Sequence, residues 1–242
     1  MGSSRTYIRH IREDGTMERG EGGELLKKAG IIASLRGVDR DRLAAAAHWL
    51  YEGGIHAMEI PLNTVGAYYL IRDLRKQLPK KALIGASAVL DVADAKAALE
   101  AGAAFLFAPG IDKKVIQFGR EARLPVYPGA LTPTEVMKAW KYGSGGVRLF
   151  PAAAIGPAYA AEIKAELGHI PLIAAGGAGR AQAAEYIRAG CDAVCIDYTA
   201  ILHSSEGTDA VKMASELAEE IHDAFRGAES NNWREPNGSP AS

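Results

Sequence analysis

Charged side chains that could carry chemistry stand in or at the ends of short apolar runs. Glu59 lies in the run 57–61, which has no other charge, and Arg36 and Arg148 lie in similar runs. Carboxylates are seldom buried unless they are paired or functional. Glu59 is therefore either a salt-bridge partner of one of these arginines or a general acid/base whose pKa is raised by burial. We favour the acid/base role, because both arginines could interact with Glu59 without removing it from a site.

Two adjacent glycines, Gly176 and Gly177, end another apolar run. Their backbone N–H groups could bind an anion, and the loops after the last two strands of a barrel form a common phosphate site. A pair of glycines can equally mark a tight turn, so both interpretations stay open. The other candidate substrate-binding residues at the ends of apolar runs are Asn63, Ser87, Thr132, Asp197 and Tyr198.

The elements that must position these residues alternate along the chain. Eight short apolar runs are predicted strands: 31–36, 57–61, 82–89, 104–108, 126–129, 146–150, 172–175 and 193–196. Strands that are apolar throughout are typical of parallel sheets covered on both faces. The stretches between them carry a single apolar stripe with helix signals, such as Asp91 before and Gly102 after one helix, and the capping box of Thr132 and Glu135.

This alternation predicts an α/β fold, a (β/α)8 TIM barrel in one domain over residues 23–226. An N-terminal helix and two polar tails, residues 1–22 and 227–242, complete the predicted organisation. An open doubly wound sheet is the alternative, but the even spacing and the lack of a G-x-G-x-x-G segment after the first strand favour the barrel. In a barrel, the candidate residues at the carboxyl ends of the strands would meet at one face.

Composition limits the classes of protein. The chain has 242 residues, 48% of them hydrophobic and 24% charged, with a formal net charge of −1. This balance gives no electrostatic signature of nucleic acid or membrane binding. The N-terminal stretch has no apolar signal segment, and Cys191 and Cys195 are expected to be free thiols rather than metal ligands. We therefore expect a cytoplasmic protein with no metal or cofactor.

Ordered motifs over most of the chain, from about Ile31 to Leu202, are similar to one enzyme family. They are Leu35-Arg36-Gly37, Gly53-Gly54-Ile55, Glu59-Ile60, Gly85-Ala86, Ala101-Gly102-Ala103, Ala108-Pro109-Gly110, Pro128-Gly129, Thr132-Pro133-Thr134-Glu135, Leu149-Phe150-Pro151-Ala152, Ile155-Gly156 and Gly176-Gly177. In these segments the chain resembles the 2-keto-3-deoxy-6-phosphogluconate / 4-hydroxy-2-oxoglutarate aldolases. The resemblance implies a barrel, a carbon–carbon lyase and a homotrimer.

The same resemblance assigns roles to particular residues. Family enzymes use a lysine directly before the Leu/Phe-Phe-Pro-Ala segment to form a Schiff base, and this chain has Arg148 there. A guanidinium stays protonated and cannot form an imine, but it can bind a carboxylate through two hydrogen bonds. The residue matching Glu59 shuttles protons, and the residue matching Arg36 helps to hold the substrate. Lys113 and Lys114 could replace the lysine, but a solvated place in the first turn of a helix is expected for both.

A further departure concerns the last strand, where Asp197-Tyr198 replaces a small Gly-Ser phosphate clasp. An aspartate a few ångströms from a phosphate would cost on the order of several kcal/mol at intermediate dielectric, which argues against a phosphorylated substrate unless a cation lies between them.

Four functional hypotheses follow. The leading one is a lyase or isomerase that acts on a small 2-oxo or 2-hydroxy carboxylic acid without an imine. Glu59 would move the proton, and Arg148 and Arg36 would bind the carboxylate or a developing enolate. The alternatives are a conventional aldolase with altered or residual activity, a catalytically silent scaffold or binding module, and a metal-assisted aldolase that holds Mg²⁺ or Mn²⁺ through Glu59 and Asp197.

Overall fold

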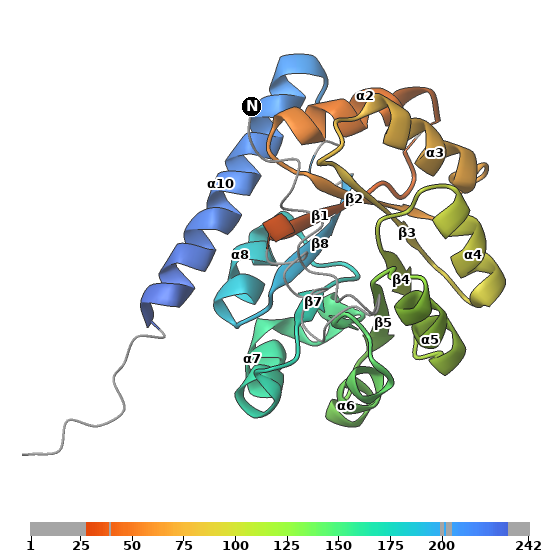
Figure 1. Cartoon of the computed structure of the whole chain (residues 1–242). Coiled ribbons are helices and arrows are strands. Elements are labelled where there is room, and N and C mark those ends of the chain that lie inside the picture. The colour runs from red at the N-terminus through yellow and green to blue at the C-terminus, as the bar shows by residue number, and fades with distance from the viewer. Residues whose placement is uncertain (1–27, 39, 199–200, 202–204, 232–242) are drawn as a thin grey trace, which may run out of the picture.

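A computed structural model describes residues 28–38, 40–198, 201 and 205–231. Eight parallel strands form a closed barrel in chain order, with the last strand paired to the first, which confirms the predicted (β/α)8 fold (Figure 1). The strands are β1 (Ile31–Ser34), β2 (Ala57–Pro61), β3 (Leu83–Ser87), β4 (Leu106–Ala108), β5 (Val126–Ala130), β6 (Val147–Leu149), β7 (Leu172–Ala174) and β8 (Ala193–Asp197).

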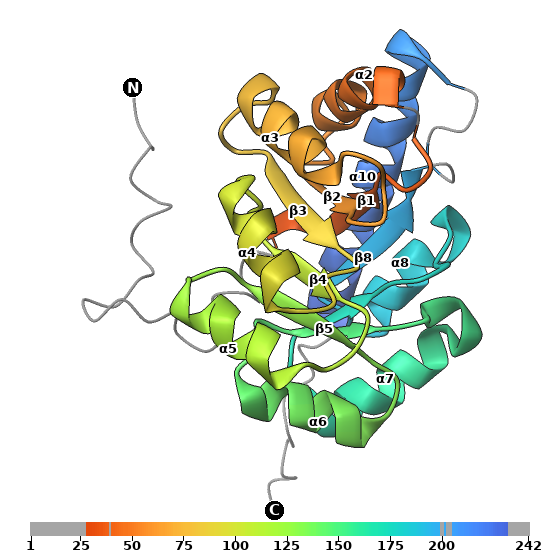
Figure 2. The ribbon, with the colours of Figure 1, turned by 90° about the vertical axis from the view of Figure 1, so that its right-hand side faces the viewer.

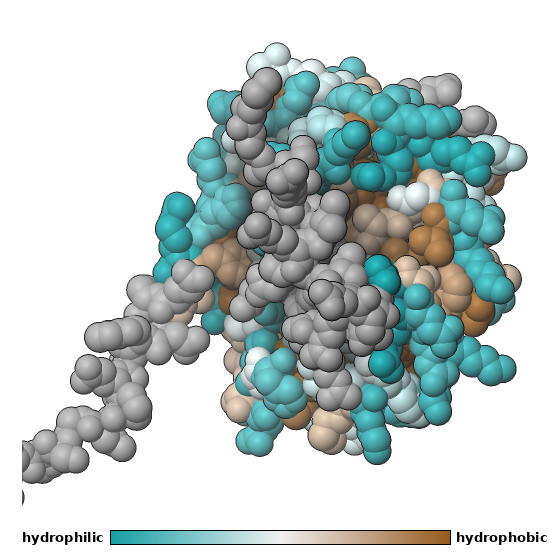
Figure 3. Space-filling view, viewed as in Figure 1, coloured by the Kyte–Doolittle hydropathy of each residue, from teal (hydrophilic) through white to brown (hydrophobic). Residues whose placement is uncertain are grey.

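Helices surround this barrel, as Figures 1 and 2 show from two directions. They are α2 (Arg40–Glu52), α3 (Ala67–Gln77), α4 (Val92–Glu100), α5 (Lys113–Glu121), α6 (Pro133–Tyr142), η1 (Ala152–Ala154), α7 (Gly156–Leu167), α8 (Arg180–Arg188) and α10 (Gly207–Asn231). The long α10 packs against α8 and α2. On the face shown in Figure 3, hydrophilic side chains cover the outer rim of the helices and hydrophobic ones lie further in, as one-sided helices require.

Side-chain hydrogen bonds begin the helices that follow β3, β4 and β5. Asp91 accepts from Asp94 N before α4, and Asp112 accepts from Lys114 N and Val115 N before α5. Thr132 and Glu135 form the predicted reciprocal capping box of α6. These caps satisfy backbone N–H groups that have no partner within the helix, so each loop turns directly from its strand into its helix.

The strands alternate between two apolar clusters. One fills the inside of the barrel: Ile32, Ala57, Leu83, Phe105, Phe107, Tyr127, Ile173, Ala175, Ala193 and Cys195. The other lies between the strands and the helices and includes Ile84, Leu149, Val194 and Ile196. Because successive strand residues face opposite sides, Glu59 shares the inner side with Ala57. Candidate residues that lie an even number of positions from an inner-cluster residue on the same strand therefore point into the barrel.

Glycines shape the inner wall. A side chain at Gly85 would collide with the ring of Phe105, and one at Gly129 would collide with the backbone of Pro109. Glycine at position 85 therefore leaves room for a large interior ring, and Gly129 lets the loop after β4 lie directly against β5. This close approach fixes one edge of the cavity described below.

Some sequence-based boundaries differ from the structure. β1 ends at Ser34 and not at Arg36, because Arg36 and Gly37 form an exposed turn, and β3 ends at Ser87, before Ala88 adopts a φ of 57°. α10 continues to Asn231, beyond the predicted domain limit at residue 226, so the proposed C-terminal tail begins within a helix. The predicted N-terminal tail, residues 1–22, lies entirely outside the described residues, as do residues 23–27, where the domain was predicted to begin. No helix among those described is long and apolar enough to cross a membrane.

Candidate active site

The carboxyl ends of β1, β2, β3 and β6 bring Glu59, Arg148 and two serines to the inner side of the barrel. Ser34 pairs with Glu59 in the β1–β2 register, and Ser87 follows two residues further along β3, opposite Pro61. Arg148 lies opposite Gly129 on β5. All four polar side chains are buried. The fold thus gathers predicted site residues at the face where barrel enzymes place their chemistry.

Glu59 is a buried carboxyl group that is only 2% exposed. Burial raises the pKa of Glu59, while polar interactions with Ser34 and Ser87 and the charges of Arg148 and Arg36 lower it less strongly. Within the described part of the chain, neither Glu59 Oε2 nor Ser87 Oγ has a hydrogen-bond partner. Glu59 therefore holds its proton at higher pH than an ordinary glutamate and has an oxygen available to a substrate.

Arg148 is a buried cation, 8% exposed, that is held by aromatic rings. Its guanidinium carbon lies 4.6 Å from the ring centre of Phe107 and 5.1 Å from that of Phe150. A hydrogen bond of 3.5 Å, at the long limit, joins Nη1 to Ala108 O. Desolvation lowers the pKa of Arg148, and Cys195 and Glu59 act in the opposite direction.

Arg148 also has unused bonding capacity. Among the described residues, Nε has no hydrogen-bond partner and the guanidinium forms no ion pair within 4 Å. A guanidinium offers five N–H donors in a planar arrangement that matches a carboxylate. Arg148 is thus a preorganised cation whose Nε has no partner among the described residues.

Gly176 and Gly177 pack under the segment that follows β6. Both have left-handed φ values, 86° and 80°. A Cβ at Gly176 would lie 2.6 Å from ring carbons of Phe150, and one at Gly177 would lie 2.8 Å from the Cβ of Ala153. The absence of side chains here allows Phe150 to reach Arg148. The predicted anion-binding role of these glycines stays a prediction.

Arg36 and Asn63 lie at the rim of the site. Both are exposed, in the loops after β1 and β2. The charge of Arg36 nevertheless acts on both Glu59 and Arg148. Arg36 is therefore close enough to contribute to the potential inside the barrel.

Thr132, Asp197 and Tyr198 have different surroundings from one another. The Thr132 hydroxyl interacts with Glu135 in the capping box. Asp197 is half-buried at the end of β8, on the inner side and opposite Ser34 in the register. Tyr198 packs in the outer cluster, and its pKa is raised by burial. The structure places Asp197 on the inner side of β8 and Tyr198 on the opposite side of the chain.

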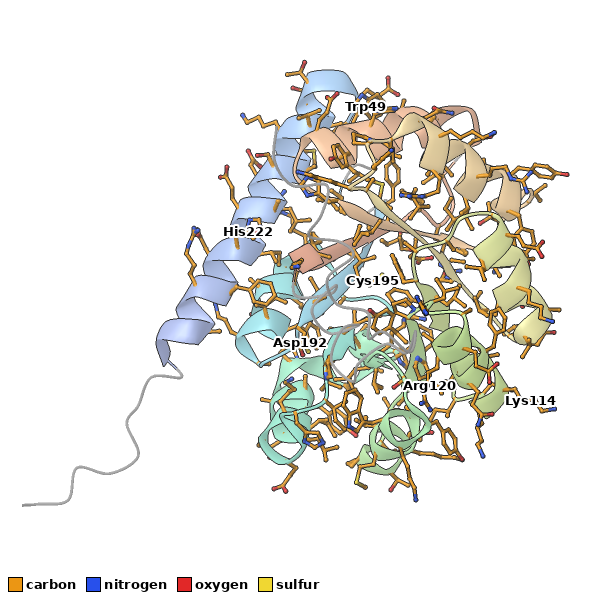
Figure 4. The ribbon with its side chains drawn as sticks, viewed as in Figure 1. Trp49, Lys114, Arg120, Asp192, Cys195 and His222 are labelled. Atoms are coloured by element: carbon orange, nitrogen blue, oxygen red, sulfur yellow. The ribbon has the colours of Figure 1, made fainter. Side chains whose placement is uncertain are left out.

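Sequence reasoning did not single out Phe107, Phe150, Ser34 or Cys195 as site residues. Cys195 lies near the centre of the barrel (Figure 4), and its charge interactions involve Glu59 and Arg148. Burial raises the pKa of the Cys195 thiol, which keeps it neutral. Both cysteines are free and buried, as predicted. Side chains alternate between the two sides of β8, and this alternation puts Cys195 and Asp197 on the same side. It is the sequence signal that could have identified Cys195 as a site residue.

A cavity of about 310 Å³ lies among the loops that follow β4, β5 and β6. Its lining consists of Pro109–Ile111, Gly129–Leu131, Glu135, Lys138 and Phe150. Phe150 forms part of both the cavity wall and the aromatic support of Arg148. The cavity and the buried site therefore have the ring of Phe150 in common.

The described residues were predicted to offer two further options, a metal site and a replacement lysine at position 113 or 114. Across the described ranges, no group of three or more His, Cys, Asp or Glu side chains could hold a metal ion. The two-carboxylate magnesium alternative remains an untested prediction. Lys113 and Lys114 are exposed in the first turn of α5, as predicted, and Lys114 points outward in Figure 4.

Comparison with known proteins gives one consistent family. A family model described as KDPG and KHG aldolase matches residues 23–215. The chain is 34% identical over 165 residues to the 2-dehydro-3-deoxy-6-phosphogalactonate aldolase of Escherichia coli (strain K12), covering 68% of this chain and 80% of the relative. A probable enzyme of the same name from Rhizobium meliloti (strain 1021) is 32% identical over 161 residues, or 66% of this chain and 76% of the relative. The native KDPGal structure has a TM-score of 0.71 at 30% identity, covering 83% of this chain and 96% of that one.

Proposed function

The chain belongs to the KDPG and KHG aldolase family, and we propose that this lyase cleaves a small 2-oxo acid without forming an imine. Family membership supports carbon–carbon bond cleavage as the reaction and a small carboxylic acid as the substrate. The absence of an imine rests on Arg148, which by the sequence resemblance occupies the position of the Schiff-base lysine. A guanidinium keeps its proton and is a poor nucleophile.

One observation carries this proposal: a buried guanidinium lies in the same barrel mouth as a carboxyl group with a raised pKa, and each has a polar atom, Arg148 Nε and Glu59 Oε2, with no partner among the described residues. A 2-oxo acid presents a carboxylate and a neighbouring ketone oxygen to such a cation. Arg148 would bind this end through two hydrogen bonds, and Arg36 at the rim would add positive potential. Negative charge that develops on the ketone oxygen would be stabilised in a site of low polarity.

The proposed cleavage needs no co-reactant. Glu59 in its ionised form takes the proton from the hydroxyl group on C4 of a 4-hydroxy-2-oxo acid. The C3–C4 bond breaks, C4 leaves as an aldehyde, and the electron pair moves to the C2 oxygen, giving an enolate beside Arg148. Glu59 then returns the proton to C3, which yields the shorter 2-oxo acid. Atoms and charge balance, because the carboxyl group ends in the state in which it began.

The decisive experiment is borohydride trapping with pyruvate, followed by mass spectrometry of the intact protein and of its peptides. The native protein should give no adduct, because no neutral amine is available at position 148. Arg148→Lys should give an adduct at that position, and Arg36→Lys, a matched change at the rim, should not. A stable adduct that maps to any lysine of the native protein would overturn the imine-free mechanism and favour conventional aldolase chemistry.

We also propose a homotrimer, on the basis of the family resemblance. Closed symmetric assemblies are common among enzymes of this size. Light scattering at micromolar concentration should give a mass near three times the 25.6 kDa of one chain. A monomer under these conditions would contradict the proposal without affecting the chemistry.

A further inference from the structure

The cavity along the loops after β4, β5 and β6 is positioned to receive the remaining carbons of a substrate whose carboxylate binds to Arg148. Phe150 stacks on the guanidinium and also lines the cavity, while Gly129 pairs with Arg148 across the β5–β6 register. A substrate bound by its carboxylate at Arg148 would therefore direct its remaining carbons along this wall. At about 310 Å³, the space equals roughly ten water molecules of liquid, which is room for a short carbon chain.

The charges of this cavity are balanced. Glu135 Oε2 accepts hydrogen bonds from Leu131 N at 3.0 Å, Thr132 N at 2.9 Å and Thr132 Oγ1 at 2.9 Å. These bonds lower the pKa of Glu135, so its carboxylate is ionised. Lys138 lies in the same lining and its charge also lowers the pKa of Glu135. One cation and one anion therefore face the space together.

The remaining lining is apolar or backbone. Ile111 and Leu131 are hydrophobic, and the ring of Phe150 is 37% exposed beside them. An ionised carboxylate accepts from hydroxyl groups, an ammonium donates to them, and an aromatic or aliphatic wall packs against the C–H side of a carbon chain. A phosphate dianion would instead meet the charge of Glu135 without an excess of cations.

We propose that this cavity holds a hydroxylated, unphosphorylated substrate tail, so that the substrate is a 2-keto-3-deoxy sugar acid without a phosphate group. This assignment rests on the proposed function, which places the carboxylate end at Arg148. Glu135 and Lys138 are the specificity-determining residues for the tail. In this proposal the tail lies in the cavity along the loops after β4, β5 and β6. It does not lie in the loop after β7, where Gly176 packs under Phe150.

Two variants of the full-length protein test the tail site. A Cβ at Gly110 would meet nothing within 4 Å and the residue has no left-handed φ, so Gly110→Leu should fill the cavity without disturbing the fold. Its matched control is Gly179→Leu, which has the same open surroundings at the start of α8. Lys138→Met removes the donor, and Lys141→Met, on the same helix and outside the lining, is its control.

The probes are 2-dehydro-3-deoxygalactonate, its 6-phosphate and pyruvate. We expect the native protein to cleave the unphosphorylated acid with a kcat/KM at least about tenfold above that for the phosphate. Gly110→Leu should lower kcat/KM for the unphosphorylated acid by at least about tenfold and leave the Kd for pyruvate within about twofold. Lys138→Met should cost about tenfold, as the loss of a charged hydrogen bond does. Both controls should behave as the native protein does.

Faster cleavage of the phosphorylated acid, cleavage of neither acid, or a loss in Gly179→Leu in place of Gly110→Leu would each overturn the tail assignment. Arg148→Gln separates this result from a failure of the proposed function. If Arg148→Gln weakens pyruvate binding while Gly110→Leu leaves sugar-acid cleavage unchanged, only the tail assignment fails. If Arg148→Gln leaves the Kd for pyruvate unchanged, the proposed function itself is wrong.

Discussion

The barrel contains two buried acid–base arrangements at its opposite ends, and only one of them is complete. Before β8, Lys164 Nζ lies 3.0 Å from Asp192 Oδ2 and also donates to Gly168 O and Ile170 O. Asp192 Oδ2 accepts in addition from Leu172 N. At the carboxyl ends of the strands, Glu59 and Arg148 are buried, whereas 15% of the Lys164 side chain is exposed; yet Glu59 and Arg148 both retain polar atoms without partners among the described residues.

This difference separates a structural ion pair from a site. Two charges removed from water are tolerated when their hydrogen bonds are satisfied, as at Lys164 and Asp192. Within the described ranges, Glu59 Oε2 and Arg148 Nε have no hydrogen-bond partner, which carries a cost in stability unless a ligand supplies one. The opposite ends of a barrel commonly divide stability and catalysis in this way. Four changes can break or sharpen the comparison.

The largest effect is expected from Glu59→Gln. Loss of proton transfer should lower kcat by about 10²- to 10⁴-fold. Folding stability at neutral pH should be unchanged or higher, because the neutral amide avoids the burial of a charge that raises the pKa of Glu59. Turnover and the melting temperature should be measured on the same variant. A much less stable protein with unchanged turnover per folded molecule would show that Glu59 is structural.

Sequence patterns predicted the strands and helix starts around this site better than the side-chain contacts inside the barrel. The apolar runs located all eight strands, and Thr132 with Glu135 located the start of α6, because these signals are local. The stacking of Arg148 on Phe107 and Phe150 depends on barrel closure, which joins distant segments. No local pattern encodes such a contact.

The alternation of side chains along β8 is enough to predict that Asp197 and Tyr198 point to opposite sides of the strand. Ala193 and Cys195 lie in the inner cluster, and side chains alternate along a strand, so Asp197 shares their side and Tyr198 does not. Both residues had been assigned to the substrate from their place at a strand end. A place at the end of a strand therefore indicates candidate site residues, and strand alternation then shows which of them point into the barrel.

The second change is Lys164→Met, which leaves Asp192 as an uncompensated buried anion. Removal of one partner from a buried pair costs about 3 to 5 kcal/mol in the free energy of unfolding. The exposed pair of Arg42 and Glu206, 2.7 Å apart, provides the control, and Arg42→Met should cost at most about 1 kcal/mol. Urea denaturation measures both. Equal losses in the two variants would remove the distinction between the satisfied pair and a surface contact.

The third change is in pH. Since the pKa of Glu59 is raised and its ionised form is the proposed base, kcat/KM should rise about tenfold per pH unit up to that pKa, above the ordinary value of 4.5. The contribution of Glu59 to folding stability should change in the opposite direction, falling as pH rises. A raised folded-state pKa means that native Glu59 stabilises the fold below the unfolded pKa and loses this contribution as pH rises through the folded pKa.

The melting temperature of the native protein relative to Glu59→Gln should therefore fall as pH rises through this interval. The comparison isolates Glu59, since all other titrating groups are shared. A difference that is flat with pH, together with an activity profile that has no acidic limb above 4.5, would mean that Glu59 is not the titrating base.

The smallest effect is expected from Thr132→Ala, which tests whether a polar residue near the site belongs to the scaffold or to the substrate. The Thr132 hydroxyl contacts Glu135 Oε2 at 2.9 Å and accepts from Glu135 N, so loss of the cap should cost about 1 kcal/mol of stability. Thr132→Ser keeps the oxygen and should retain nearly all of it. KM for a 2-oxo acid should stay within about twofold in both variants, because the hydroxyl is already engaged. A several-fold rise in KM for Thr132→Ala that Thr132→Ser restores would instead show that Thr132 is a substrate ligand as well as a helix cap.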